Sequence, residues 1–550
     1  MVPFIIPQAI VPLPSSGNGG HSSQTANLLL CHDSKVAALA LIATVAEFLA
    51  ESRDGVVIED GAVLFDLAAS KYSVSGEHQK CVLHLWSSER NAVRRVVDAE
   101  VKNDVLRLAV QRLGQSKPTK LEICRQRDRR TPTAKKAARA AYQKCLQRVL
   151  DRRFQGFKLI SCSRAIDLER SFGPIYVRGL LRQGQTGFAV LGVSGEETQS
   201  SIDASLTFGI LWLEACRESE AGRSVVAGLK LFTPPGTSAV LRERMAHLHP
   251  LAAKWQLYEF DEREDALREI DLADRGNLAT HLVHSTDGGA ARERFAEAIR
   301  YVTDVMAEVE VAVLSPAEIA FRRYGLEFAR ARLAHQPGSI RSTAEIVFGV
   351  AGEERVLCDE NSAAFVRLVR SVGEVRHPSG PRDHALWRMH PERWLESLVM
   401  TNVAAVDERL DVRRLYSQVP AFSAADRAMI DVLTVTRDGR RAVLELKADE
   451  DIHLPMQGLD YWARVAWHQA RGEFQRFGYF PGRELSPENP LLLLVAPALH
   501  VHPATDILLR YLKPEIEWAL VGIDERWRNG VRMVFRKRSE NGTSDGRVQP

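Results

Sequence analysis

The chain has 550 residues, too many for one hydrophobic core, so three or four domains are expected. Its composition, with 45% hydrophobic and 26% charged residues, is that of ordinary globular protein. The 73 basic and 70 acidic residues nearly cancel, which leaves a formal charge of +3. The overall charge therefore indicates no class of binding partner, and only local clusters of charge can do so.

The N-terminal residues 1–27 are apolar and contain several prolines but no Lys or Arg, which is a poor match to a signal peptide and predicts a flexible tail. The longest apolar stretch covers residues 36–50, whereas a membrane span needs about 20 apolar residues. We therefore expect a buried helix there, N-capped by Asp33 or Ser34, and no membrane anchor.

The seven cysteines are scattered along the chain, and none forms a Cys-x-x-Cys pair. This pattern argues against a disulfide framework and against a structural zinc site. A reducing, cytoplasmic compartment is expected.

Residues 28–116 are predicted to form an N-terminal α/β domain, and residues 117–158 a basic helical segment with 14 basic and 3 acidic residues. The excess of positive charge favours phosphate binding, although a solvated helix face has the same pattern. The candidate nucleic-acid-binding residues of this segment are Arg129, Arg130, Lys135, Lys136 and Arg139.

Strands and helices alternate over residues 159–275, which predicts another α/β domain. Residues 276–384 are predicted to contain two helices, over 291–309 and 316–333, and a short hairpin over 344–358 before a turn-rich linker.

The last domain is predicted over residues 385–540, followed by a disordered tail over 541–550. Its pattern is helix, three strands, helix, strand, helix and two strands, which predicts a mixed sheet with helices on both faces. The fold class expected for the whole chain is multidomain α/β.

A hairpin in this domain, "MIDVLTVTRDGRRAVLELK", carries charges inside both of its apolar strands: Asp431, Glu445 and Lys447. Such charges cost several kcal/mol unless something compensates them. A two-residue Asp438-Gly439 turn would place Asp431 and Glu445 on opposite faces. A three-residue turn closed by a left-handed Gly439 would make them direct cross-strand neighbours, and we predict this second register.

Two neighbouring carboxylates repel each other unless a cation lies between them, and oxygen ligands suit Mg²⁺ or Mn²⁺. The cation would activate a water, and Lys447 on the same face would orient that water and offset phosphate charge. The alternative is an ordinary ion pair of Lys447 with Asp431 or Glu445 on a half-exposed sheet.

The runs "IDVL", "VLELK" and "QGLDY" follow one another in an order that resembles the PD-(D/E)XK nuclease superfamily, specifically its RecB-like and NucS-type branches. The resemblance covers roughly residues 385–535. The chain lacks the proline that precedes the aspartate in the superfamily's name.

The resemblance implies that Asp431 and Glu445 bind a metal ion, with Glu396 of "WLESLV" assisting and Glu392 as the alternative. The Leu446 carbonyl is implied as an additional ligand.

It also implies that Lys447 serves the attacking water, and that Gln457 and Tyr461 position the site or contact the substrate backbone. The expected activity is that of a Mg²⁺- or Mn²⁺-dependent nuclease acting on DNA rather than RNA, with a homodimer as a candidate state and no membrane partner. The alternative is a catalytically inert nucleic-acid-binding or scaffold protein that retains the fold.

Residues 177–195 align without gaps on residues 430–448, which suggests a degenerate second copy of the same fold that has lost its metal ligands. The alternative is two ordinary α/β hairpins with common apolar residues. In this alignment the paired residues are Arg178 with Asp431, Gly192 with Glu445, and Ser194 with Lys447.

Overall fold

The computed structural model describes residues 41–539 except 53–54, 60–61, 68–69, 78–79, 87–90, 103, 112–117, 126–131, 275–279, 287, 336–341, 351–353 and 423–428. It divides into two compact units, residues 1–131 and 132–550. The predicted tails (1–27 and 541–550), the N-cap at Asp33 or Ser34, and Arg129 and Arg130 all lie outside the described residues.

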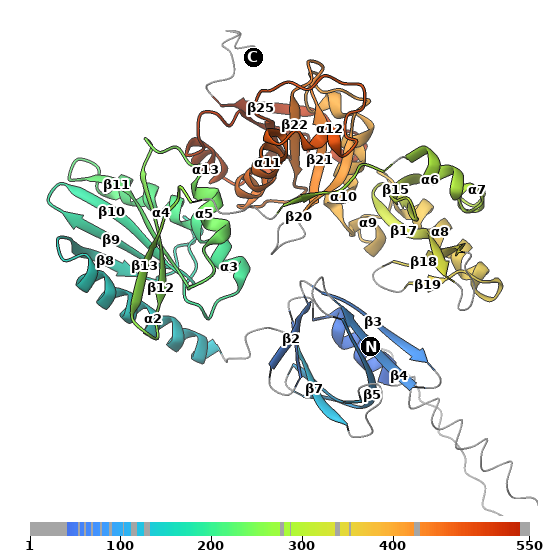
Figure 1. Cartoon of the computed structure of the whole chain (residues 1–550), viewed down its shortest axis with the longest axis horizontal. Coiled ribbons are helices and arrows are strands. Elements are labelled where there is room, and N and C mark those ends of the chain that lie inside the picture. The colour runs from blue at the N-terminus through green and yellow to red at the C-terminus, as the bar shows by residue number, and fades with distance from the viewer. Residues whose placement is uncertain are drawn as a thin grey trace, which may run out of the picture. The chain divides into compact units, whose positions relative to one another are not determined.

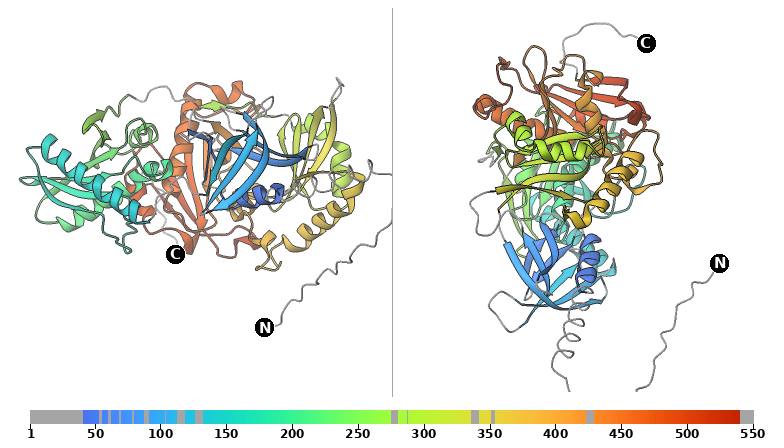
Figure 2. Two further views of the ribbon diagram at one scale, coloured as in Figure 1. Left: turned by 90° about the horizontal axis from the view of Figure 1, so that it is seen from below. Right: turned by 90° about the vertical axis from the view of Figure 1, so that its right-hand side faces the viewer.

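The first unit is an antiparallel sheet with one described helix, over residues 41–50 (Figures 1 and 2). The helix buries Val45, Phe48 and Leu49 against the sheet. The strand order is β2-β1-β7-β6-β5-β4-β3, with bounds β1 Val56–Glu59, β2 Ala62–Asp66, β3 Lys71–Glu77, β4 Lys80–Trp86, β5 Asn91–Lys102, β6 Val105–Gln111 and β7 Thr119–Cys124.

The prediction that residues 117–158 form one helical segment is wrong in its first part. Residues 119–124 form β7, which pairs with β1 and β6 of the first sheet. The helix α2 begins only at Pro132 and ends at Arg153. Leu121 and Ile123 have no exposed surface, so burial of alternate side chains selects the strand here.

A six-stranded mixed sheet follows, in the order β13-β12-β11-β10-β9-β8. Helix α2 covers one face and α4 the other. The bounds are β8 Lys158–Ser163, β9 Val177–Gln183, β10 Thr186–Gly192, α3 Gln199–Asp203, α4 Ser205–Ser219, β11 Val225–Thr233, α5 Ala239–Met245, β12 Lys254–Asp261 and β13 Ala266–Ile270.

A five-stranded antiparallel sheet, β15 to β19, comes next and packs on α6, α7 and α8. The predicted helix over 316–333 is wrong, because this stretch forms β16 and β17 around a left-handed turn at Tyr324 and Gly325. The bounds are α6 Gly288–Arg294, α7 Ala296–Thr303, β15 Glu310–Ser315, β16 Glu318–Arg323, β17 Leu326–His335, β18 Ser342–Phe348, β19 Arg355–Val356 and α8 Ser362–Val375.

The C-terminal sheet has seven strands in the order β14-β20-β21-β22-β23-β24-β25, with α10 on one face and α11 on the other. This agrees with the predicted mixed sheet. The bounds are β14 His281–Leu282, α9 Ala385–Arg388, α10 Pro391–Thr401, β20 Tyr416–Phe422, β21 Met429–Val435, β22 Arg441–Leu446, α11 Leu454–Ala470, α12 Glu473–Arg476, β23 Leu491–Pro497, α13 Thr505–Arg510, β24 Trp518–Ile523 and β25 Met533–Arg538.

The middle and C-terminal sheets have the same order and connections, as the repeat hypothesis requires. Strands β8 to β13 match β20 to β25: two antiparallel pairs, two parallel pairs and a final antiparallel pair. Helix α4 connects β10 to β11 as α11 connects β22 to β23.

Across the part of the chain that is described, no helix is both long and apolar enough to span a membrane.

Candidate active site

The hairpin of β21 and β22 has the predicted register. Val432 pairs with Leu444 and Val435 with Arg441, which places residue 431 opposite residue 445. The turn is closed by a hydrogen bond from the Thr436 amide to the Arg440 carbonyl, 2.7 Å, and Gly439 has a φ of +90°. The three-residue turn is therefore confirmed.

The two carboxylates of this hairpin lie side by side. Asp431 Oδ2 accepts a hydrogen bond from the Leu446 amide at 3.0 Å. Glu445 is only 2% exposed, and no described group hydrogen-bonds to its Oε2. Burial and the neighbouring charge of Asp431 raise the pKa of Glu445 well above its ordinary value.

Lys447 supplies the positive charge of the site. Its Nζ lies 3.2 Å from Glu445 Oε1 and 3.5 Å from Asp451 Oδ2. Burial by itself would lower the pKa of Lys447, but the charges of Glu445 and Asp451 outweigh it and raise that pKa. The lysine is therefore held in its protonated form.

Glu396 lies on α10 and reaches Asp431 through an amide. Gln418 Nε2 donates to Glu396 Oε2 at 2.7 Å and to Asp431 Oδ1 at 3.3 Å. Arg393 also lies 3.0 Å from Glu396. Burial raises the pKa of Glu396, the charge of Arg393 lowers it, and the net direction is upward.

Gln418 was not predicted as a site residue. It stands opposite Asp431 across β20 and β21, and its φ of +51° is left-handed, which is uncommon for a residue with a side chain. Nothing in the local sequence signals this conformation, because a lone Gln within a strand pattern has no distinctive spacing.

The arrangement fits a hard divalent cation at two carboxylates. Within the described ranges, no group of three or more His, Cys, Asp or Glu is placed to hold a metal ion, and the amide of Gln418 bridges Glu396 and Asp431. Yet the buried Glu445 Oε2 lacks a partner beside a second carboxylate. A cation would satisfy that oxygen and remove the repulsion.

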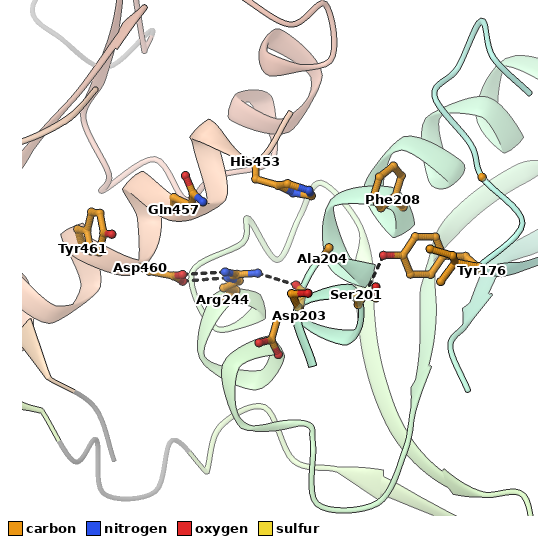
Figure 3. A pocket seen from close by; sticks show the side chains of 13 residues that line it. Tyr176, Ser201, Asp203, Ala204, Phe208, Arg244, His453, Gln457, Asp460 and Tyr461 are labelled. Atoms are coloured by element: carbon orange, nitrogen blue, oxygen red, sulfur yellow. Dashed lines mark hydrogen bonds and ion pairs between the residues drawn. The ribbon is translucent and has the colours of Figure 1, made fainter. Parts of the chain in front are cut away.

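Gln457 and Tyr461 lie one turn apart on α11, on the wall of a pocket of about 680 Å³ (Figure 3). Burial, together with the charges of Glu445 and Asp431, raises the pKa of Tyr461. The Oε1 of Gln457 is buried without a hydrogen-bond partner among the described residues. The opposite wall belongs to the middle domain and includes Ser201 and Phe208.

Helix α2 contains three of the five predicted nucleic-acid-binding residues, Lys135, Lys136 and Arg139. Lys136 is exposed and lines a pocket of about 580 Å³ together with Arg139 and Arg164. Arg139 is paired with Glu197 at 2.6 Å, so its charge is already compensated. Lys135 is half-buried on the same helix.

The hairpin of the middle domain is one residue shorter than the C-terminal hairpin. Gln183 pairs with Thr186 across a two-residue turn, so Arg178 pairs with Leu191. The ungapped alignment of Gly192 with Glu445 and of Ser194 with Lys447 is therefore wrong by one residue.

Hydrogen bonds at the ends of β10 and β22 show which residues of the two hairpins are equivalent. The Val193 amide donates to the Phe232 carbonyl of the next strand, as the Lys447 amide donates to the Val495 carbonyl. Leu191 and Val193 thus occupy the places of Glu445 and Lys447, and Arg178 occupies the place of Asp431.

No protein-family model and no curated protein matches the chain. Among solved structures, EndoMS in its apo form is similar, with 13% sequence identity and a TM-score of 0.14 over 37% of this chain and 89% of that chain. A TM-score of this size carries no argument, so the candidate site rests on its own geometry.

Proposed function

We propose that this chain is a metal-dependent nuclease of the PD-(D/E)XK type, hydrolysing phosphodiester bonds of DNA in preference to RNA. The observation that carries the proposal is the buried, unpartnered Glu445 Oε2 beside Asp431, with Lys447 3.2 Å from the same carboxyl group. A structural ion pair would satisfy its oxygens, whereas this arrangement leaves one without a partner.

The proposed metal ligands are Asp431 and Glu445, with Glu396 assisting through Gln418. A bound Mg²⁺ or Mn²⁺ would lower the pKa of a coordinated water and neutralise charge on the scissile phosphate. A bound cation would favour the charged form of Glu445, which burial and the charge of Asp431 disfavour.

The remaining roles belong to side chains around this pair. The protonated Lys447 places a positive charge beside the carboxylates, where it can orient the water and stabilise the charge that develops on the phosphate. The unpartnered Oε1 of Gln457 and the hydroxyl of Tyr461 can hold the substrate backbone on the pocket side.

The activity is tested with labelled single-stranded, branched and mismatched DNA in the presence of Mg²⁺ or Mn²⁺. Asp431→Ala and Lys447→Ala are expected to lower the cleavage rate by at least about 100-fold. Glu450→Ala, which removes an exposed carboxylate three residues from Lys447, is the matched control and should cleave like the parent chain. Cleavage that survives both site substitutions contradicts the assignment.

A thermal melt separates an active nuclease from an inert protein with the same fold. Mn²⁺ is expected to raise the melting temperature of the parent chain and not that of Asp431→Ala, because a ligand that binds only the folded state stabilises it. A metal-induced shift without cleavage of any substrate would favour the inert nucleic-acid-binding alternative.

A further inference from the structure

The middle and C-terminal sheets with their helices, residues 158–270 and 416–538, form two similar halves of one pair. Each half contacts the other through equivalent helices. Helix α4 of the middle half packs on α13 of the C-terminal half, and α11 packs on α5. Since α4 corresponds to α11 and α5 to α13 in the order of elements, these two contacts are equivalent. Reciprocal contacts of this kind are the signature of twofold pairing.

The twofold relation between the two halves is centred on a backbone contact between equivalent residues. Leu248 and Leu512 form an antiparallel bridge with each other. The His249 amide donates to the Tyr511 carbonyl at 2.8 Å, and the Lys513 amide donates to the His247 carbonyl at 3.0 Å. The two segments, "HLHP" and "YLKP", each follow the corresponding helix, so equivalent residues pair with each other.

Only one of the two halves carries the proposed chemistry. In the middle half, Arg178 stands in the place of Asp431, with its guanidinium 4.4 Å from the centre of the Phe172 ring. Leu191 stands in the place of Glu445 and is fully buried in the shared core. An arginine and a leucine cannot hold a divalent cation.

The contact between the two halves buries the helical face of the C-terminal half. A second C-terminal half could pair in the same manner only through that face. Leu459 and Leu508 of the C-terminal half share one core with Leu206 and Ile210 of the middle half. Arg244 adds a bidentate pair to Asp460, at 2.9 and 2.7 Å, beside the pocket that both halves line (Figure 3). This face of the catalytic half is therefore occupied within the chain.

We infer that the chain is an internally paired nuclease that cuts one strand of duplex DNA in each binding event, with the middle half as its non-cutting partner. This inference rests on the proposed function. A single water attacks a single phosphorus, one P–O ester bond breaks, and the departing oxygen takes up a proton. The product is a nick with one new phosphate end and one new hydroxyl end.

The test uses the full chain on an excess of supercoiled plasmid with Mn²⁺ or Mg²⁺. Open circles are expected to accumulate first, with linear DNA at least about 10-fold slower, and the rate should rise in proportion to the enzyme concentration. Adding a fivefold excess of Asp431→Ala chain should leave the initial rate unchanged while plasmid remains in excess. Arg178→Met, the matched change in the middle half, should nick within about twofold of the parent rate.

Two results would overturn this inference alone: linear DNA that forms as fast as open circles, or a rate that falls when the inactive chain is added. Either would mean that two catalytic halves act together. Absence of cleavage of any form would instead overturn the proposed function, and this inference with it.

Discussion

At the scale of single residues, the turn at Gly439 decides whether the site exists. Its φ of +90° gives the third residue of the turn a left-handed conformation, and this turn brings residue 431 opposite residue 445. A side chain at this position would also meet the Glu484 carbonyl, since a Cβ built there lies 2.3 Å from that oxygen. Conformation and space therefore both require glycine.

Gly439→Ala is expected to lower the free energy of unfolding by about 3 kcal/mol or more, because left-handed strain and a backbone clash add together. Gly482→Ala is the matched control, since Gly482 has a φ of +68° but open space around its Cβ position. It should cost only about 1 kcal/mol. Urea unfolding of both variants measures the difference, and equal losses would show that the predicted clash relaxes.

At the scale of an element, strand β11 buries a cation whose contacts include an aromatic ring and an amide. Lys230 is 4% exposed, its Nζ lies 4.5 Å from the centre of the Phe188 ring, and it is hydrogen-bonded to Gln256. Burial lowers the pKa of Lys230 from 10.5 to about 8. The folded state therefore releases a proton that the unfolded chain still holds between about pH 8 and pH 10.5.

Lys230→Met is expected to raise the free energy of unfolding at pH 7 by about 2 to 3 kcal/mol, because the cost of the buried charge is then removed. The gain should shrink as the pH rises from 8 toward 10.5, since the parent chain recovers stability as Lys230 loses its proton. Chemical denaturation at pH 7 and pH 10 tests this. Lys254→Met, an exposed change on the neighbouring strand, should alter neither value; a gain that does not depend on pH would contradict the argument.

At the scale of the whole second unit, the middle and C-terminal halves share one hydrophobic core that spans α4, α5, α11 and α13. Each fully buried Leu, Ile or Val in that core contributes roughly 1.5–3 kcal/mol. Arg244, which is 9% exposed, forms an ion pair with Asp460 and donates a hydrogen bond to the Asp203 carbonyl. The two halves are therefore expected to unfold together.

Asp460→Asn is expected to destabilise this unit by about 3 kcal/mol, because it leaves the guanidinium of Arg244 buried without its counter-ion. Adding Arg244→Met should recover part of the loss and give a coupling energy of about 1.5 kcal/mol or more in a double-mutant cycle. Asp506→Asn, which breaks the exposed pair with Lys537, should cost less than about 0.5 kcal/mol. A coupling energy near zero would contradict the role of the Arg244–Asp460 pair.

The sequence by itself predicted the register of the hairpin that holds Asp431 and Glu445, because an Asp-Gly turn and charges at alternating positions restrict that register to two local alternatives. It also suggested a repeat of the same fold in the middle half, whose strand order only the tertiary structure showed. Only the tertiary structure decided the rest. Residues 316–333, rich in Ala and Arg, pair as β16 and β17 because long-range burial of Phe321 and Phe328 outweighs local helix propensity.

The position of Gln418 between Glu396 and Asp431 depends on a left-handed strand residue that no local pattern encodes. The shorter turn at residues 184–185, which moved the correspondence from Gly192 to Leu191, follows from pairing that an ungapped alignment cannot represent. The joining of the two halves through Leu248 and Leu512 depends on surfaces about 264 positions apart in sequence, which meet only because both bury the same kind of helical face.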